Sequence, residues 1–399
     1  MTAIYDLSAP EVRADPWSLY AALRDEPGVH RVGPLDHYLV ARYADVVEAL
    51  ERVDDFSSLE MANQLGPIDA LGSLTGAEPR DLPATIISSD NPVHNRLRLV
   101  MQGRFSPRAV AKIEGPVREL TDALIASIVE KGECDLVRDF TIPLPVIVIA
   151  QLLGIEEERF EDFKRWSDAL IAIANARGAE RQTHLAEITQ LVQYFLAMAE
   201  RRRAEPGDDL ISVLVDAERE DDRISRAEVL AFAVLLMVAG NETTTNLIGG
   251  MVEVFMEFPE QLGKLVADPS LTRRAVEEGL RYCSPVQGLF RNATRDVDLA
   301  GTMIPEGAPL MVCYASANRD PAVFEEPDRF DIERDARRHV AFGRGLHFCL
   351  GANLARREAR IAIEKLLPLL PRFRRTRDES DWVDSWFLRG PKTLPLALE

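Results

Sequence analysis

Residues 342–351 read FGRGLHFCLG, a short stretch in which three glycines surround one cysteine. Glycine lets the backbone turn tightly and approach another group closely. Apolar residues at helical spacing follow directly and end near Pro368, so Cys349 is expected at or near the start of a helix. The helix dipole and the free N–H groups there favour a thiolate, which is a good ligand for iron. The alternative for Cys349 is an inert buried thiol.

The other three cysteines, Cys134, Cys283 and Cys313, lie far apart in the sequence. Their spacing suggests neither a disulfide framework nor a zinc site. We interpret them as ordinary buried thiols in a reducing, cytoplasmic compartment.

A second segment combines a long helical pattern with polar residues in its middle. Ser225 and Glu228 have the spacing of a capping box, and the periodicity continues to about Phe258, just before Pro259. Residues 229–240 are apolar on all sides and are expected to be buried, but residues 241–246 read NETTTN. Burying a carboxylate is costly unless it is paired or solvated, so Glu242 and Thr243 are candidates for a proton relay into a cavity. The alternative is a helix side that faces a polar interface.

Composition and charge narrow the class of protein. The chain has 399 residues and a formal net charge of -18, which argues against binding a nucleic-acid backbone through the bulk surface. The first ten residues lack the basic and apolar regions of a signal peptide. The most apolar stretches, 142–155 and 229–240, are shorter than the roughly 20 residues of a membrane span. We expect a soluble, unanchored protein.

The pattern of elements is mostly helical. Residues 91–130 and 156–205 have helical periodicity, and short strands are expected at 37–41, 292–299 and 309–314. Residues 60–90 are rich in Gly, Pro and small polar residues and predict a long ordered loop. Alternating strand and helix units are absent from the pattern. The sequence therefore predicts a mainly α protein with small β sheets, folded as a single domain over residues 1–399.

Three segments together resemble the cytochrome P450 family. Residues 342–351 resemble its haem-binding signature, which includes Phe342 and Cys349, and residues 239–243, AGNET, resemble the signature of its long central helix. Glu278 and Arg281 match its Glu-x-x-Arg pair, and Arg329 resembles a third partner of that pair. The resemblance covers most of the chain and implies a single-domain fold with a long central helix over haem b. It makes Cys349 the axial ligand of the haem iron.

The resemblance also implies contacts to the haem propionates. His94 and Arg98 are four residues apart on one face of a helix, and Arg291 and His347 match further contacts. Carboxylates in a half-buried site need charge-assisted donors, which suits these residue types. Each of the four could instead be a surface residue or an ordinary polar contact.

The implied reaction is reductive activation of O2, with Glu242 and Thr243 helping to deliver protons. One oxygen atom would enter a C–H or C=C bond of the substrate and the other would leave as water. Two alternatives remain open, a peroxide-driven peroxygenase and a non-catalytic haem sensor or carrier. Peroxygenases of this family replace the acid–threonine pair that is present here.

Electrons would come from another protein, because no flavin or iron–sulfur motif is evident. Residues 334–360 contain seven arginines and two acids, a local charge of +5. This basic face, near Arg344, Arg356 and Arg357, could bind an acidic ferredoxin. The alternative is that these arginines have structural partners.

The substrate is suggested only by the apolar character of the expected pocket. By family position, the pocket would be lined by Leu235, Val238, Ala239, Val286, Gln287, Leu289 and Phe387. These residues favour a hydrophobic small molecule, although each could instead be plain core.

Overall fold

The computed structural model describes residues 5–7, 9–33, 37–61, 83, 85–173, 176, 178–219, 224–377 and 381–399. Most of the loop expected at 60–90 lies outside these residues. The chain contacts define two compact units. The first unit comprises Met1–Ser57, Lys112–Leu144 and Thr243–Glu399, and the second comprises Ser58–Ala111 and Pro145–Glu242. That the whole chain is one domain stays a prediction.

The first unit contains a six-stranded sheet in the order β1-β2-β3-β9-β6-β4. Its strands are β1 (Tyr5–Asp6), β2 (His30–Gly33), β3 (His37–Val40), β4 (Phe56–Ser57), β6 (Leu289–Ala293) and β9 (Pro309–Val312). Helix α3 (Tyr43–Glu51) belongs to the same core, where Val46 and Leu50 pack with Leu310 and Val312. The neighbouring strands β6 and β9 run antiparallel, and Arg291 lies opposite Leu310.

Two expected strands differ in their boundaries. The segment 292–299 is divided, because β6 ends at Ala293 and β7 (Val297–Leu299) pairs with β8 (Thr302–Ile304) instead. The run from Pro309 ends at Val312, and Tyr314 begins the short helix α16 (Tyr314–Ala317). The apolar pattern of this run continues into α16, where all four residues are buried, so hydrophobicity alone did not mark the end of the strand.

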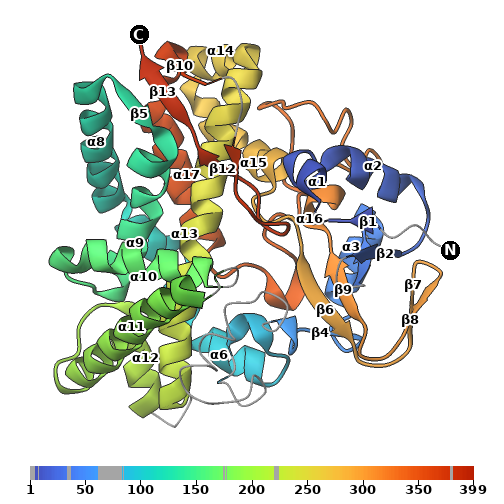
Figure 1. The fold of residues 1–399 in the computed structure, drawn as a ribbon, viewed down its shortest axis with the longest axis horizontal. Coiled ribbons are helices and arrows are strands. Elements are labelled where there is room, and N and C mark those ends of the chain that lie inside the picture. Colours follow the sequence, from blue (N-terminus) through green and yellow to red (C-terminus); the bar gives the residue numbers. More distant parts are fainter. Residues whose placement is uncertain are drawn as a thin grey trace. The chain divides into compact units, whose positions relative to one another are not determined.

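A smaller sheet uses the C-terminal strand β13 (Pro395–Leu398) as its middle strand, between β10 (Phe373–Arg375) and β5 (Glu133–Asp135). Helices α8 (Glu114–Lys131), α15 (Thr272–Cys283) and α17 (Ala352–Leu366) are also in the first unit, and α17 packs against both others (Figure 1). The remaining elements of this unit are α1 (Pro10–Ala14), α2 (Trp17–Asp25), η3 (Val137–Thr141), α14 (Pro259–Ala267), η5 (Pro269–Leu271), η6 (Gly345–His347), η7 (Leu370–Arg372), β11 (Asp381–Trp382) and β12 (Pro391–Thr393).

The second unit is helical. Its elements are η2 (Ile86–Ser88), α6 (Val93–Met101), η4 (Glu157–Arg159), α10 (Phe160–Ala172), α11 (Gly178–Ala204) and α12 (Leu210–Arg219), and α10 and α11 pack side by side (Figure 1). Helices α7 (Pro107–Lys112) and α9 (Pro143–Leu153) cross the boundaries between the units. The helical segments expected at 91–130 and 156–205 are therefore confirmed, and so is the mainly α fold class with small sheets.

The long helix α13 (Arg226–Glu257) begins in the second unit and ends in the first. The predicted capping box is present, since the backbone N of Ser225 donates to Glu228 Oε2 at 2.7 Å and the backbone N of Glu228 donates to Ser225 Oγ at 3.2 Å. Arg96 of α6 adds two bonds to the Glu228 carboxylate, at 2.6 and 3.1 Å. The cap therefore also fixes α6, which carries His94 and Arg98, against the start of α13.

Burial of α13 differs from the expectation that residues 229–240 are covered on all sides. Leu235 and Val238 are half-buried and Ala239 is exposed, whereas Phe232 and Met237 are buried. By length and composition, α13 is the one helix in the described ranges that could cross a membrane. Because 56% of its most apolar window is buried, it has the character of a core helix.

Candidate active site

The loop before α17 is held in a fixed shape. Gly343 and Gly345 both have φ near +67°, a left-handed conformation that glycine adopts without strain. The backbone N of Cys349 donates to the carbonyl of Phe342 at 2.9 Å, which closes the loop. Helix α17 begins three residues later, at Ala352. The expected position of Cys349 near a helix start is confirmed.

Cys349 differs from the other three cysteines in its exposure to solvent. Cys134, Cys283 and Cys313 are buried, and burial raises the pKa of each thiol to about 12. Cys349 is only half-buried, and a Cβ on Gly351 would already lie 4.0 Å from its Sγ. The thiolate is the form of cysteine that binds a metal, and a glycine next to the sulfur leaves room for a flat group. The residues present fit a haem iron at Cys349.

A cluster of charged and aromatic side chains supports this loop. The guanidinium of Arg356 on α17 stacks on the ring of Phe342 at 4.5 Å and donates to Glu277 at 2.7 and 3.1 Å. His339 also contacts Glu277, at 3.1 Å. Burial alone would raise the pKa of Glu277, but hydrogen bonds from His339 and Arg356 outweigh it and lower that pKa to about 2. Glu277 therefore stays ionised and keeps Arg356 over Phe342.

The predicted propionate contacts lie in both units. In the first unit, Arg291 lies on β6 and is 4% exposed, and His347 ends the short helix η6. The Arg291 side chain is oriented by a 2.6 Å bond from Nη1 to the carbonyl of Phe290. In the second unit, His94 and Arg98 lie one turn apart on α6, and His94 is fully buried. Their roles toward haem stay predictions.

Glu242 and Thr243 lie on an accessible stripe of α13. The residues of α13 between 235 and 243 that remain accessible occur at helical spacing on one face: Leu235, Val238, Ala239, Gly240, Glu242 and Thr243. Burial, together with the negative charge of Asp168 on α10, raises the pKa of Glu242 to about 6. Neighbouring polar residues are used structurally, since Asn241 donates to Ser167 at 2.9 Å and Thr245 donates to the carbonyl of Thr141 at 2.8 Å. Glu242 and Thr243 are therefore accessible, whereas Asn241 and Thr245 are buried and form hydrogen bonds within the fold.

The other predicted pocket residues come together in the first unit. Val286 forms a bridge with Leu388, and the backbone N of Gln287 donates to the carbonyl of Phe387 at 2.8 Å. Val286, Leu289 and Phe387 are half-buried. Gln287 is 2% exposed, and its side chain lines a separate small cavity with Tyr20, Trp382, Trp386, Leu388 and Arg389. These positions leave the pocket role of the seven residues a prediction.

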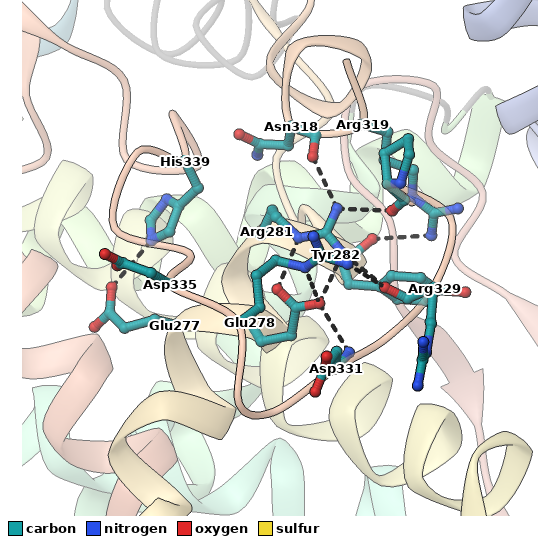
Figure 2. Close-up of polar contacts among 12 residues, drawn as sticks. Glu277, Glu278, Arg281, Tyr282, Asn318, Arg319, Arg329, Asp331, Asp335 and His339 are labelled. Atoms are coloured by element: carbon teal, nitrogen blue, oxygen red, sulfur yellow. Dashed lines mark hydrogen bonds and ion pairs between the residues drawn. The ribbon is translucent and has the colours of Figure 1, made fainter. Parts of the chain in front are cut away.

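The Glu278–Arg281 pair is fully buried. Arg281 donates to Glu278 at 2.7 and 2.8 Å, and to the carbonyls of Asn318 and Pro327 at 3.0 and 2.8 Å (Figure 2). Charges without water need this complete set of partners. The pair therefore fixes α15 to the long segment that precedes the Cys349 loop.

The third partner of this pair is Arg334, and the expectation of Arg329 was wrong. Arg334 Nε donates to Glu278 Oε1 at 3.1 Å, and its side chain is 13% exposed. The side chain of Arg329 is 52% exposed and pairs with Glu326, while its backbone carbonyl accepts from Arg281 at 3.2 Å. Figure 2 shows Arg329 next to the pair. Spacing in the sequence could not tell whether the backbone or the side chain of Arg329 faces inward.

Each arginine between 334 and 360 has a contact within the chain. Arg334 and Arg356 bind Glu278 and Glu277, whereas Arg357 and Arg360 bind Glu114. Arg337 pairs with Asp335, and Arg338 lies over the ring of Tyr43. Arg344 pairs with Glu51 at 2.6 Å, and both side chains are 51% exposed. These contacts favour a structural role for Arg356 and Arg357 and leave Arg344 the most accessible of the three arginines expected to bind a ferredoxin.

Comparisons with known proteins agree on one family. A family model for cytochrome P450 matches residues 136–381. Cytochrome P450 107B1 of Saccharopolyspora erythraea is 39% identical over 94% of this chain and 93% of the relative. The vitamin D(3) 25-hydroxylase of Pseudonocardia autotrophica is 39% identical over 100% of this chain and 97% of the relative. The solved structure of cytochrome P450 CYP109Q5 from Chondromyces apiculatus aligns with a TM-score of 0.89 and 39% identity, over 100% of this chain and 99% of that chain. The chain therefore belongs to the cytochrome P450 family, and it is a monooxygenase with haem b as its cofactor.

Proposed function

We propose that the thiolate of Cys349 would bind the haem iron and that the enzyme inserts one atom of O2 into a hydrophobic small molecule. The observation that carries this proposal is the fixed, glycine-bounded loop that leaves the thiol of Cys349 accessible while the other three thiols are buried. When bound, a haem with a cysteine thiolate ligand supplies the cleavage of the O–O bond. Hydroxylation or epoxidation is the expected outcome.

The residues that would hold haem b are mostly polar. His94, Arg98, Arg291 and His347 would bind the propionates, because these carboxylates need charge-assisted donors. Phe342, which Arg356 and Glu277 keep in place, would be a further contact of the haem. The fixed orientation of the Arg291 side chain supports this assignment.

Glu242 and Thr243 would deliver protons. A pKa of about 6 lets the Glu242 carboxyl take up and release a proton near neutral pH, which is what a relay requires. The hydroxyl of Thr243, the next residue on the same accessible stripe, would pass that proton on. This pair also favours O2 over peroxide as oxidant.

The substrate proposal rests on the apolar part of the stripe. Leu235, Val238 and Ala239 present only carbon atoms on the accessible face of α13. A relative with 39% identity is named for hydroxylating vitamin D(3), a hydrophobic molecule. We expect a substrate of similarly low polarity, with Val286, Leu289 and Phe387 as further contacts.

The electron donor would be a separate ferredoxin-type protein that binds near Arg344 in the cytoplasm. Arg344 is half exposed, and Phe348, next to Cys349, is 40% exposed. An exposed cation beside an exposed aromatic ring, close to the proposed iron ligand, suits a small acidic partner. Arg356 and Arg357 would instead stabilise the Cys349 loop through their bonds to Glu277 and Glu114.

The assignment of Cys349 is tested by the absorption spectrum of the reduced protein with carbon monoxide. The unchanged protein should give a Soret band shifted strongly to the red, the sign of thiolate ligation. Cys349→Ser should lose that band or the haem, whereas Cys283→Ser should keep both. A shifted band that survives in Cys349→Ser would contradict the assignment.

The oxidant is tested by product formation. NADH with a ferredoxin and its reductase should support turnover of a hydrophobic substrate, which is found first by the change in iron spin state on binding. Turnover with hydrogen peroxide alone, and none with the electron donors, would favour a peroxygenase. Substrate binding without turnover under either condition would favour a haem carrier.

A further inference from the structure

The chain between β11 and β12 forms a tip, residues 384–389, that carries the proposed substrate contact Phe387. On one side the tip is bound to the segment before β6 through the main chain. The backbone N of Gln287 donates to the carbonyl of Phe387 at 2.8 Å. The backbone N of Arg389 donates to the carbonyl of Pro285 at 2.9 Å. The position of Phe387 therefore depends on how firmly the two ends of the tip are held.

Both ends of the tip are also bound to helix α1. Arg389 donates from Nη1 to the carbonyl of Arg13 at 2.8 Å and from Nη2 to the carbonyl of Ala14 at 2.9 Å, and this red loop lies beside α1 in Figure 1. At the other end, Asp384 forms an ion pair with the side chain of Arg13. The last carbonyls of a helix have no partner within the helix, so the several donors of a guanidinium suit them. Helix α1 and the tip are thus joined by polar contacts at two points.

Arg389 is placed for this contact rather than for an ion pair. Its guanidinium lies over the ring of Trp382 at 3.9 Å and over that of Trp17 at 5.6 Å. Among the described residues, no carboxylate pairs with it, and its side chain donates only to the two carbonyls of α1. Burial lowers the pKa of Arg389 to about 10, so the side chain stays charged near neutral pH. Because a charged donor makes stronger hydrogen bonds than a neutral one, these two bonds set the distance between α1 and the tip.

Packing between α1 and the tip is incomplete. A cavity of about 10 Å³ is lined from both sides, by residues that include Val12, Arg13, Gln287, Trp386 and Leu388. Gln287 Oε1 is buried there and has no hydrogen-bond partner among the described residues. No residue of α1 is buried in the core. Atoms that face a void lose dispersion contacts, so the attachment of α1 to the tip relies on the polar bonds of Arg389.

We propose that Arg389 is a positioning residue, which fixes Phe387 in the substrate pocket by clamping the tip to α1. This inference rests on the proposed pocket, and all of its residues belong to the first unit. Without the clamp, the tip moves relative to α1 and the space beside Phe387 changes. Trp386 limits this movement, because its ring packs on Phe290 at 5.1 Å. The clamp therefore acts on ligands that reach Phe387 and leaves the binding of haem unchanged.

The test uses two ligands of the haem iron that differ in size. Imidazole contacts little beyond the iron, whereas 4-phenylimidazole carries a ring that must also fit into the pocket. Arg389→Met keeps an apolar chain beside Trp382 and removes both bonds to α1. It should weaken 4-phenylimidazole binding about ten-fold, as expected for the loss of hydrogen bonds from a charged group, and leave imidazole binding unchanged. Optical titration of the holoenzyme measures both dissociation constants.

Two further variants show whether the charged bonds of Arg389 are responsible. Arg389→Lys keeps a charged donor and should recover most of the lost affinity for 4-phenylimidazole. Arg42→Met is the matched control, because Arg42 also donates to two backbone carbonyls near the end of a helix. These are the carbonyls of Arg24 and Asp25 in α2, at 2.7 and 3.2 Å. Arg42→Met should leave the affinity for both ligands unchanged.

Hydrogen exchange reports on the tip itself. The amide of Gln287, which is bonded to the carbonyl of Phe387, should exchange about ten-fold faster in Arg389→Met than in the unchanged protein. Arg42→Met should leave this rate unchanged. Mass spectrometry of peptides that contain Gln287 measures it. An unchanged rate in Arg389→Met would show that the tip is held without the clamp, which overturns the proposal.

Three results of the titrations also overturn it. Equal weakening of imidazole and 4-phenylimidazole would show that Arg389 acts on the haem site through the fold. Unchanged affinity for 4-phenylimidazole in Arg389→Met would show that the clamp does not reach the pocket. An Arg389→Lys variant as weak as Arg389→Met would assign the effect to packing instead of charged bonds.

Phe387→Ala separates these failures from a failure of the proposed pocket. If Phe387→Ala changes the affinity for 4-phenylimidazole and Arg389→Met does not, only the inference about Arg389 is wrong. If neither variant changes that affinity, the pocket role of Phe387 is wrong as well.

Discussion

Glu358 is a carboxylic acid in the core, on α17 between the Cys349 loop and the end of the helix. It is 2% exposed, and its Oε2 has no hydrogen-bond partner among the described residues. Burial raises its pKa from 4.5 to about 8. Near neutral pH this side chain is therefore mostly protonated and uncharged in the folded protein.

This pKa predicts a dependence of stability on pH. Because the folded protein binds the proton more tightly than the unfolded chain, the contribution of Glu358 is complete below pH 4.5 and is lost as the pH rises through about 8. The full difference corresponds to roughly 4–5 kcal/mol. Glu358→Gln should flatten the free energy of unfolding over this pH range, as measured by urea denaturation. Glu364→Gln, on the same helix but paired with Arg118 near the surface, should keep the slope. Equal slopes in Glu358→Gln and the unchanged protein would contradict a buried acid.

Thr243 supplies a second prediction at this scale. Thr243→Ala removes the accessible hydroxyl next to Glu242, so proton delivery should fail and oxygen should leave as peroxide. We expect NADH consumption to continue while product per NADH falls about 10²-fold or more, the range typical of lost general acid–base catalysis. Product and peroxide are measured in the same reaction. Thr245→Ala is the matched control, because Thr245 bonds to the carbonyl of Thr141 and is buried. Intact coupling in Thr243→Ala would remove the relay role.

At the scale of elements, local sequence signals predicted the ends of α13 and the position of the Cys349 loop. The Ser225–Glu228 cap and Pro259 gave both ends of α13, because caps and proline act through adjacent backbone. The glycine-rich loop likewise gave the position of Cys349. The residues of the accessible stripe of α13 were expected to face a pocket only by family position, since which side of an apolar helix is left uncovered depends on distant segments.

The contacts of α15 give a prediction that distinguishes two nearby arginines. Arg334→Met leaves the buried Glu278 carboxylate short of one charged donor, which should lower the free energy of unfolding by about 2–3 kcal/mol. Arg329→Met should change it by less than about 0.5 kcal/mol, because its side chain is exposed and its carbonyl bond is kept. Thermal unfolding of both variants measures the difference. A larger loss of unfolding free energy in Arg329→Met than in Arg334→Met would support Arg329 as the third partner, as expected from the sequence.

At the scale of the whole molecule, charge is distributed unevenly. The chain carries a net charge of -18, yet residues 334–360 carry +5. The sequence showed this local excess of positive charge but not which groups the arginines bind. The partners of Arg356 and Arg357 lie 79 and 243 residues away in the chain. Charge reversal at Arg356 would also release Phe342, so it would not isolate a docking effect.

Arg344 allows a cleaner prediction. Arg344→Glu should slow reduction by a ferredoxin about three- to ten-fold at low salt and weaken the dependence of the rate on ionic strength, because an exposed charge at an interface mainly affects association. Stopped-flow reduction at several salt concentrations measures both. Arg138→Glu, an exposed arginine next to β5, serves as the control. Identical salt dependence in the two variants would place the donor elsewhere.

The C-terminal strand has a consequence for protein engineering. Residues Pro395–Leu398 are paired on both edges, with β10 and β5, and the backbone N of Glu399 donates to the carbonyl of Arg372 at 3.0 Å. A reductase fused to this chain to make a self-sufficient enzyme should therefore be joined by a flexible linker placed after Glu399. A junction that replaces even four of these residues would remove the strand that joins the other two.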